Sequence, residues 1–273
     1  MKTIYSIVVT TILLSIILPN YSHANERRFG YTYETLVLPN GAKEIEIWNT
    51  DRRGREYFYR RLDQRIEYEF GVGSNLMSAF YLNYTTKTKD DNENSAGGKK
   101  TSSYAASISS EWKYKILDRV ADPLGFALYG EGTLGTDKYE IEGKLILDKQ
   151  MQNILIAFDI AGEFESESDV TNGNEIISEE IKLISDLGVA YVFTKSFGTG
   201  VELRNENIFI NGFVNHSSLF GGLTLSYSTE SWWATLSFLP QITSFKDGTA
   251  SGKILDLNEF EKFQTRLLLS FHI

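Results

Sequence analysis

Charged side chains that recur at every second position are the feature of this sequence with the clearest chemical meaning. Residues 61–70 read RLDQRIEYEF, with Arg, Asp, Arg, Glu and Glu at the odd positions and mostly apolar residues at the even ones. Residues 138–148 and 154–165 repeat this alternation. Successive side chains of a β-strand point to opposite faces of its sheet, so each segment predicts one ionised face and one apolar face. Ionised faces that enclose water can select and conduct charged solutes.

Catalytic chemistry finds little support in the sequence. Histidine is scarce, and there is no Gly-x-Ser-x-Gly motif or phosphate-binding loop. A hydrolase needs a nucleophile beside a positioned base, but Ser217 follows His216 directly, and adjacent residues on a strand point apart. The acidic loop residues Asp90, Asp91 and Glu93 lie beside glycines and lysines, which is more typical of a solvated loop than of a calcium site. We therefore predict that the chain is not an enzyme and has no metal site and no cofactor.

The elements that carry these charges are short alternating segments separated by turn-forming residues. They predict an all-β fold, a transmembrane antiparallel up-and-down β-barrel of about 12 strands. No stretch after residue 24 reaches 18 apolar residues, so membrane-spanning helices are not expected. The predicted strands are 43–53, 58–72, 75–88, 101–117, 124–135, 138–149, 153–168, 176–194, 198–210, 217–229, 232–245 and 261–273.

Connections between these strands alternate in length, as expected for short periplasmic turns and longer extracellular loops. Residues 89–100 and 246–260 are among the long connections, and residues 73–75 and 195–197 are among the short ones. Aromatic residues cluster at strand ends beside the short turns, which predicts a girdle at the periplasmic interface. The expected girdle residues are Tyr68, Phe70, Trp112, Tyr114, Tyr191, Phe193, Tyr227, Trp232 and Phe271.

The charged face of each strand should point into the barrel. An Arg or Lys on the lipid face would cost roughly 2–4 kcal/mol at the membrane midplane, so the ionised residues are expected to line the lumen. The expected lumen-lining residues are Arg61, Asp63, Arg65, Glu67, Glu69, Glu111, Lys113, Glu131, Glu140, Glu142, Lys144, Asp159, Glu163, Lys182, Asp186, Glu202, Arg204, Glu206 and Arg266.

The N-terminal region divides into two parts before the barrel. Residues 1–24 have a lysine near the start, an apolar run and Ser22-His23-Ala24, the pattern of a signal peptide cleaved after Ala24. Residues 25–42 are expected to be a periplasmic or lumen-tucked lead-in, and an extra paired strand over residues 28–38 is the alternative. Residues 43–273 are the predicted barrel. Pro240, inside a predicted strand, suggests a bulge or kink there.

Two segments of the N-terminal third resemble a family of uncharacterised proteobacterial outer-membrane β-barrel proteins. They are residues 31–48, YTYETLVLPNGAKEIEIW, and residues 61–73, RLDQRIEYEFGVG. The match covers about 60 residues, and the other strands agree only in barrel style. This resemblance implies a barrel of the Gram-negative outer membrane and supplies no catalytic or binding residues.

Two functions fit these observations. The first is a passive, porin-like channel or transporter for small polar or cationic solutes, favoured by the acidic excess of the lumen. The second is a structural or surface-interaction barrel whose lumen is closed by ion pairs and which acts through its extracellular loops. The expected partners are outer-membrane lipid, the barrel-assembly machinery during biogenesis and a small solute. A net charge of -9 argues against nucleic acid.

Overall fold

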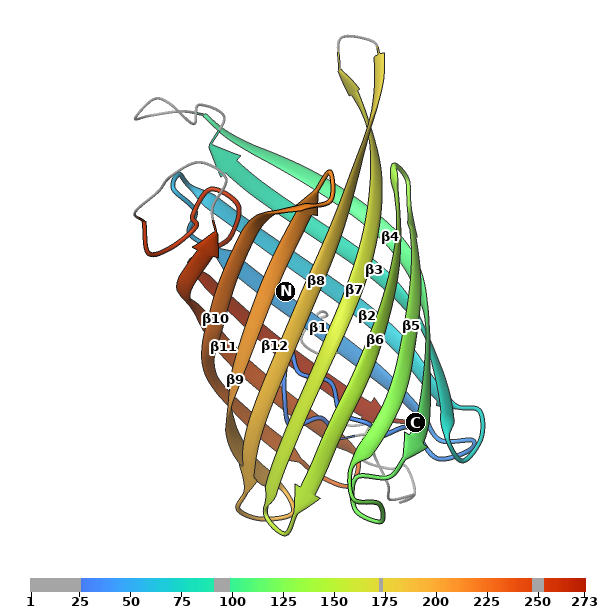
Figure 1. The fold of residues 1–273 in the computed structure, drawn as a ribbon. Coiled ribbons are helices and arrows are strands. Elements are labelled where there is room, and N and C mark those ends of the chain that lie inside the picture. The colour runs from blue at the N-terminus through green and yellow to red at the C-terminus, as the bar shows by residue number, and fades with distance from the viewer. Residues whose placement is uncertain (1–25, 91–98, 172–173, 247–252) are drawn as a thin grey trace, which may run out of the picture.

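The computed structural model describes residues 26–90, 99–171, 174–246 and 253–273, which form one closed antiparallel β-barrel (Figure 1). Each strand pairs with the next along the chain, and the last pairs with the first. The predicted barrel is thereby confirmed. The strands are β1 (Lys43–Arg53), β2 (Tyr59–Gly71), β3 (Leu76–Asp90), β4 (Lys100–Leu117), β5 (Gly125–Gly135), β6 (Lys138–Met151), β7 (Ile154–Thr171), β8 (Asn174–Val192), β9 (Phe197–Ile210), β10 (Phe213–Ser228), β11 (Trp232–Lys246) and β12 (Phe263–His272).

Alternation along the strands places apolar side chains on the outside of the barrel. On β5, Leu128 and Leu134 are exposed, whereas Ala127 and Tyr129 are buried. A water-soluble protein buries such leucines, and an exposed apolar surface that extends over many strands is suited to lipid. Among the described residues there is no helix that is long and apolar enough to cross a membrane.

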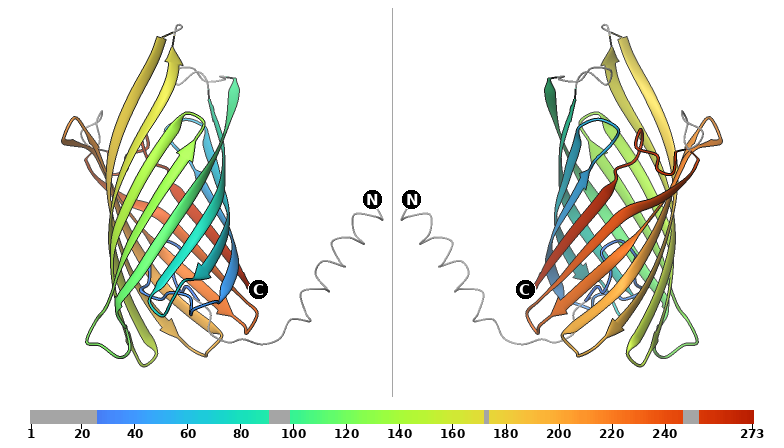
Figure 2. Two further views of the ribbon diagram at one scale, coloured as in Figure 1. Left: turned by 90° about the vertical axis from the view of Figure 1, so that its right-hand side faces the viewer. Right: turned by 90° about the vertical axis from the view of Figure 1, so that its left-hand side faces the viewer.

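The two ends of the barrel differ in their connections. We call the end that holds the β6–β7 connection and the start of β1 the turn end, and the opposite end the loop end. At the loop end, the β7–β8 hairpin extends beyond the rest of the rim (Figure 2). The β9–β10 connection at that end is shorter than expected, because β10 begins at Phe213 and not at residue 217. Asn211 and Gly212 both have positive φ and make a two-residue turn, which an Asn-Gly pair favours.

The irregularity expected at Pro240 lies slightly further along β11. Leu219 pairs with Thr243 and Phe220 pairs with Gln241, so the β10–β11 register shifts within these few residues. Pro240 itself is the last residue of β11 that pairs with β12. A ladder that ends at proline needs no N–H donor there, which explains how the residue is accommodated.

Residues 26–42 form no strand and lie inside the barrel at the turn end (Figures 1 and 2). We call them the plug segment; the alternative of a thirteenth strand over residues 28–38 is not observed. Phe29, Tyr31 and Tyr33 are each at most 7% exposed, and each belongs to a different apolar cluster with the barrel wall. The apolar core of the molecule therefore lies between the plug segment and the inner wall.

Gly188 on β8 provides room for the plug segment. A Cβ added at this glycine would lie 2.6 Å from the ring of Phe29, which is closer than side-chain carbons approach one another. The absence of a side chain at this position thus allows the Phe29 ring to pack directly on the wall.

Candidate functional site

The loop-end half of the barrel encloses a cavity of about 710 Å³, which we call the vestibule. Its volume is in the range of cavities that hold small molecules. Tyr31 and Tyr33 of the plug segment line it and form its floor. Burial raises the pKa of both tyrosines to about 12, so the floor carries uncharged hydroxyl groups at neutral pH.

One side of the vestibule carries a row of cations, which we call the basic wall. It consists of Arg52 of β1, Arg61 and Arg65 of β2, Lys87 of β3 and Arg266 of β12. These four strands are neighbours in the barrel, so the charges share one side of the lumen.

Arg266 is held without a carboxylate partner among the described residues. Its guanidinium donates to Thr50 Oγ1 at 2.9 Å and to the carbonyl of Gly30 at 3.1 Å, and lies 4.0 Å from the ring centre of Tyr31. By contrast, Arg61 donates to Asp63 at 2.7 Å. Arg266 therefore retains an uncompensated positive charge directly above the floor.

The other side of the vestibule, which we call the acidic wall, is built by β6, β7 and β8. Three lysines neutralise part of it: Lys138 lies 2.9 Å from Glu165, Lys144 lies 2.7 Å from Glu142, and Lys182 lies 2.6 Å from Glu163. Carboxylates outnumber these lysines, so the wall is negative overall. The glutamates of the acidic wall are Glu140, Glu142, Glu163, Glu165, Glu167 and Glu180.

The two walls face each other across the lumen, because β7 is about half a turn of the barrel away from β1. Between them, Arg204 pairs with Asp186 and Glu206, both at 2.7 Å, and Arg65 reaches Glu131 at 3.2 Å. The vestibule is thus polarised across its width and not uniformly acidic. Such an arrangement creates a transverse field in which a solute with two opposite charges is oriented.

Carboxylates of the wall bind the backbone of the plug segment. Glu202 of β9 accepts hydrogen bonds from the backbone N–H groups of Gly30, Tyr31 and Thr32 at 3.0, 2.8 and 2.8 Å. Three N–H groups that converge on one carboxylate make an anion-binding turn, and hydrogen bonds to a charged acceptor are about twice as strong as neutral ones. Glu202 is therefore the main anchor of the plug segment.

Two further carboxylates hold the same segment. Asp159 of β7 accepts from the N–H of Tyr33 at 2.7 Å. Asp148 of β6 accepts from the N–H of Thr35 at 2.9 Å and from its hydroxyl at 2.6 Å. A segment without regular structure has its backbone donors satisfied in this way although it lies in the interior.

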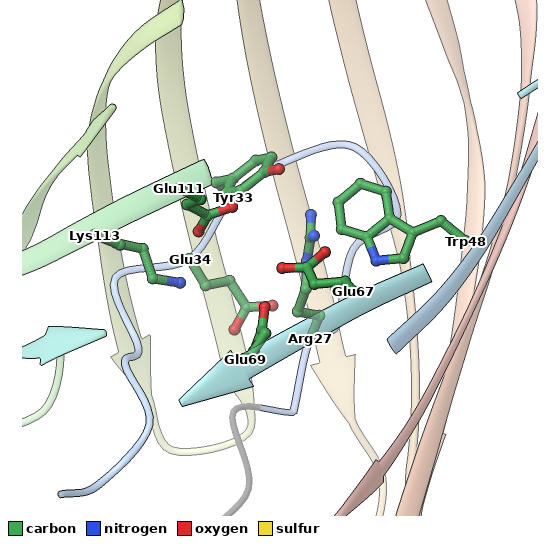
Figure 3. A pocket seen from close by; sticks show the side chains of 8 residues that line it. All are labelled: Arg27, Tyr33, Glu34, Trp48, Glu67, Glu69, Glu111 and Lys113. Atoms are coloured by element: carbon green, nitrogen blue, oxygen red, sulfur yellow. The ribbon is translucent and has the colours of Figure 1, made fainter. Parts of the chain in front are cut away.

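A second cavity of about 10 Å³, room for a single water molecule, lies at the turn end beneath the floor (Figure 3). Glu34 and Arg27 of the plug segment and Glu67, Glu69 and Lys113 of the wall are among the residues that line it. The plug segment and the wall thus leave little free space at this end of the lumen.

The predicted lumen-lining residues fall into three groups. Those that line the vestibule are Arg61, Asp63, Arg65, Glu131, Glu140, Glu142, Lys144, Glu163, Lys182, Arg204, Glu206 and Arg266. Those that line the small cavity are Glu67, Glu69, Glu111 and Lys113. The remaining three, Asp159, Asp186 and Glu202, are buried and bind the plug segment or Arg204. Two of the acids that suggested a cation path, Asp159 and Glu202, therefore hold the plug segment.

The predicted girdle residues lie near the turn end, and most are exposed on the outside of the barrel. Tyr191 packs edge-on against Phe193, with ring centres 4.9 Å apart. Tyr227 contacts Trp232 at 5.4 Å across the β10–β11 turn. Trp112 and Tyr114, about half exposed, point outward from β4.

The β11–β12 connection turns inward where it is described. His216 Nδ1 and a carboxylate oxygen of Asp256 are hydrogen-bonded at 2.6 Å. Phe260 packs edge-on against Phe220. Glu261 is buried next to Arg55. Residues 253–262 thus cover part of the vestibule mouth, whereas the sequence suggested a loop free for surface contacts; the loop residues 91–98 lie outside the described part of the chain.

Sequence reasoning missed several residues of the site. Arg52 and Lys87 have the same strand parity as the predicted lumen residues, so alternation alone would have found them. Tyr31 and Tyr33 carry no such signal, because they belong to no strand. Asp148 has the parity of the polar face of its strand. Parity does not predict its hydrogen bond to Thr35, because that bond depends on the path of the plug segment.

Comparison with known proteins agrees with the barrel. A model of a family of unknown function (DUF6662) matches residues 21–273. A search of curated proteins finds no match to the chain.

Solved outer-membrane barrels share the fold at low sequence identity. The COG4313 outer membrane channel from Pseudomonas putida F1 has a TM-score of 0.62 and 10% identity over 88% of this chain and 98% of that chain. The NanC porin has a TM-score of 0.53 and 10% identity over 84% of this chain and 100% of that chain. The translocator domain of the autotransporter NalP from Neisseria meningitidis has a TM-score of 0.52 and 9% identity over 86% of this chain and 90% of that chain. These likenesses concern the fold alone.

Proposed function

Because the chain belongs to this family of unknown function, its role has to be argued from its own barrel, and we propose that it is a gated outer-membrane channel for small zwitterionic solutes. The observation that carries this proposal is the polarised vestibule, in which the basic wall faces the acidic wall across about 710 Å³. A solute that bears an ammonium and a carboxylate group satisfies both walls at once. Zwitterions are a narrower class than the small polar or cationic solutes expected from the sequence.

The plug segment is the gate in this proposal. It fills the turn-end half of the lumen and is held by Glu202, Asp159 and Asp148. Solute that enters from the loop end reaches the floor at Tyr31 and Tyr33 and passes only when the segment moves. Hydrogen bonds can be exchanged with water one at a time, so such a movement does not require the barrel to open.

Location and partners complete the proposal. The exposed apolar surface suits outer-membrane lipid, and a barrel of this kind requires the assembly machinery for insertion. The export signal proposed for residues 1–24 lies outside the described residues. None of the vestibule residues forms an arrangement of nucleophile and base, so no reaction is proposed.

Liposome swelling with refolded protein tests the solute class. We expect a zwitterionic amino acid to enter several times faster than an uncharged polyol of the same size. Neutralising part of the basic wall, with Arg52→Gln and Arg61→Gln, should remove this preference while the polyol rate is kept. Equal rates for both solutes in the unmodified protein would refute a zwitterion channel.

The closed-lumen barrel remains the second candidate, because the plug segment is deeply buried and bound by several carboxylates. It predicts no solute entry, even after the plug anchors are removed. The swelling assay therefore separates the two candidates when it is repeated with Glu202→Ala, which should conduct only if the lumen is a path.

A further inference from the structure

Four buried glutamates of β1 and β2 face one another at the turn end. Glu44 pairs with Glu69 and Glu46 pairs with Glu67 in the strand register, and all four are at most 4% exposed. Like charges directly opposite each other on neighbouring strands destabilise a sheet. Two such pairs in adjacent positions, taken out of water, require a compensating positive charge or protons.

The protein supplies only part of this compensation. Glu46 Oε1, Glu69 Oε2 and both carboxylate oxygens of Glu67 are buried and have no hydrogen-bond partner. Among the described residues, His272 Nε2 lies 3.4 Å from Glu44, a contact that is an ion pair only when the imidazole is protonated. Arg27 and Lys113 line the adjacent small cavity, and the charge of Arg27 acts on Glu46 and Glu67, but in the described part of the chain no ion pair joins either cation to these carboxylates.

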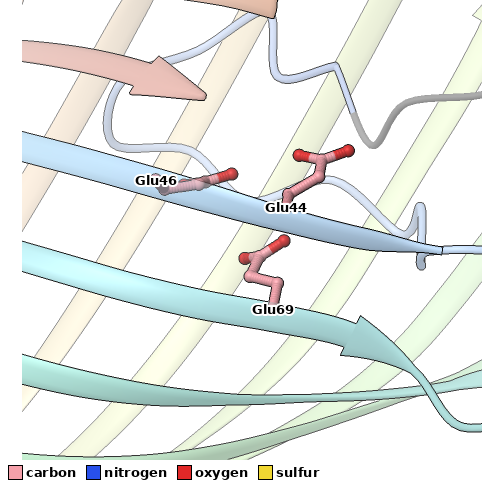
Figure 4. Close-up of side chains that lie close together, drawn as sticks. All are labelled: Glu44, Glu46 and Glu69. Atoms are coloured by element: carbon pink, nitrogen blue, oxygen red, sulfur yellow. The ribbon is translucent and has the colours of Figure 1, made fainter. Parts of the chain in front are cut away.

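Three of the glutamates are spaced for one metal ion. Glu44, Glu46 and Glu69 each present one carboxylate oxygen, and these oxygens lie within 4.8 Å of one another (Figure 4). Two oxygens bound to the same Ca²⁺ are at most roughly 5 Å apart, since each lies about 2.3–2.6 Å from the ion, so one ion can reach all three oxygens. The small cavity beside Glu69 has room for one water, which would supply a further oxygen ligand.

A second acidic group shows why spacing alone is insufficient. Glu140, Glu163 and Glu165 on the acidic wall meet the same distance criterion. There, however, Lys138 lies 2.9–3.0 Å from Glu140 and Glu165, and Lys182 lies 2.6 Å from Glu163. Each carboxylate of that group already has a lysine partner, so the group serves as an internal comparison.

We propose that Glu44, Glu46 and Glu69 bind a hard divalent cation such as Ca²⁺. The unpartnered oxygens of Glu46 and Glu69 point to a missing cation, and the spacing lets one ion reach all three carboxylates. The ion joins β1 to β2 beside the plug segment and strengthens the turn end. This inference is independent of the proposed channel function, because it depends only on the turn-end glutamates.

Terbium luminescence gives a direct test, since Tb³⁺ replaces Ca²⁺ at oxygen sites and is sensitised by nearby indole rings. Trp48 Nε1 donates to Glu46 Oε2 at 2.7 Å, and Trp233 Nε1 donates to Glu44 Oε2 at 3.3 Å. Refolded full-length protein freed of metal with a chelator should show sensitised emission that saturates near one Tb³⁺ per chain. Excess Ca²⁺ should reverse it.

Matched variants identify which carboxylates bind the Tb³⁺ ion that gives the emission. Glu46→Gln with Glu69→Gln should lower the emission at least tenfold, and Glu140→Gln with Glu165→Gln should leave it unchanged. Trp48→Phe, which keeps every ligand, should reduce the emission several-fold without changing the Ca²⁺ concentration needed for competition. This last variant keeps the test valid if the glutamine variant fails to refold.

Two results would overturn the proposal. The first is absence of sensitised emission from the unmodified protein, together with an unfolding temperature that Ca²⁺ does not raise; the carboxylates then share protons. The second is emission that survives unchanged in the folded Glu46→Gln, Glu69→Gln variant, because the ion would then bind elsewhere.

Discussion

Glu202 on β9 accepts the backbone N–H of Tyr31 at 2.8 Å, and this contact joins the barrel wall to the residue that forms the vestibule floor. The same carboxylate binds the N–H groups of Gly30 and Thr32, and Ser237 donates to it as well. Glu202 therefore accepts more hydrogen bonds from the plug segment than Asp159 and Asp148, which hold it as well. In the proposed gate, these contacts keep the lumen closed.

Replacement of Glu202 by alanine should release the plug segment. Each buried N–H left without an acceptor costs roughly 1–3 kcal/mol, and those of Tyr31 and Thr32 lose theirs, whereas Gly30 keeps Ser237 Oγ at 3.1 Å. In Glu202→Ala, a reporter cysteine at Val37, which is 9% exposed, should react with a water-soluble maleimide at least tenfold faster than in the Val37→Cys protein alone. The protein has no native cysteine, so labelling reports only on this position.

The control for this variant is Glu180→Ala, which removes a vestibule carboxylate that does not touch the plug segment. Its labelling rate should equal that of the parent. An unchanged rate in Glu202→Ala would mean that the anchor does not control the segment.

A methyl group at Gly188 should displace the plug segment from the other side. Its Cβ would lie 2.6 Å from the Phe29 ring, so Gly188→Ala forces the ring to move. Gly162 on the adjacent strand has no atom within 4 Å of its added Cβ, and Gly162→Ala is the matched control. Limited trypsin digestion should cleave Gly188→Ala at Arg27 and Arg28 faster than the parent, and it should cleave Gly162→Ala at the parent's rate. Equal protection of the two variants would exclude the packing of Phe29 on Gly188.

Neutralising charges on the acidic wall and on the basic wall should change ion selectivity in opposite directions. In the Glu202→Ala background, Glu140→Gln with Glu142→Gln should shift the reversal potential in a salt gradient toward anion preference. Arg52→Gln with Arg61→Gln should shift it toward cation preference, because the basic wall is then weakened. Shifts of the same sign in both variants would contradict a polarised vestibule.

The β4–β5 turn should give a local dependence of stability on acid. The backbone N–H groups of Val120 and Ala121 donate to Asp118 and lower the pKa of its carboxyl to about 2. Because the pKa of Asp118 is lower in the folded state, its ionised carboxyl stabilises the protein at a pH above the unfolded value, near 4, and this contribution is lost as the pH falls through about 2. The unfolding temperature of Asp118→Asn should thus be lower than that of the parent at pH 6, and the difference should disappear below pH 2. A difference that is constant with pH would contradict this origin.

Strand parity explains why the barrel could be predicted strand by strand, whereas the lead-in over residues 25–42 was expected only to be periplasmic or tucked into the lumen. Residues 61–70 alternate because one side meets lipid and the other the lumen, and β2 forms where this pattern predicts it. Inward-facing charges follow from the same rule. The Asn211-Gly212 turn was also readable from its residue types.

The partners of these inward charges depend on contacts across the barrel, which alternation does not encode. Glu202 has the parity of a pore residue, yet it binds the backbone of residues 30–32, more than 160 positions earlier. The facing of the two walls likewise depends on the closed strand order and not on any local pattern. The resemblance to an uncharacterised barrel family agrees with the family model, although the model does not test the two segments that suggested it.

A reversible lock on the plug segment tests its role as a gate. A Cβ built at Gly125 lies 2.9 Å from the side-chain oxygen of Thr35, close to the ~3 Å between a Cβ and the far sulfur in a disulfide, and it requires the carboxylate of Asp148 to turn aside. Thr35→Cys with Gly125→Cys should therefore form a single disulfide between the plug segment and the start of β5. Each single-cysteine protein is the control.

Single-channel recording of this double variant in a planar bilayer is the most direct measurement. The gated-channel account predicts no openings when the disulfide is formed and discrete openings of the same barrels after a reductant is added. Identical openings before and after reduction would show that the plug segment is not the gate. Silence in both states, and in Glu202→Ala as well, would show that the lumen is not a path for solutes.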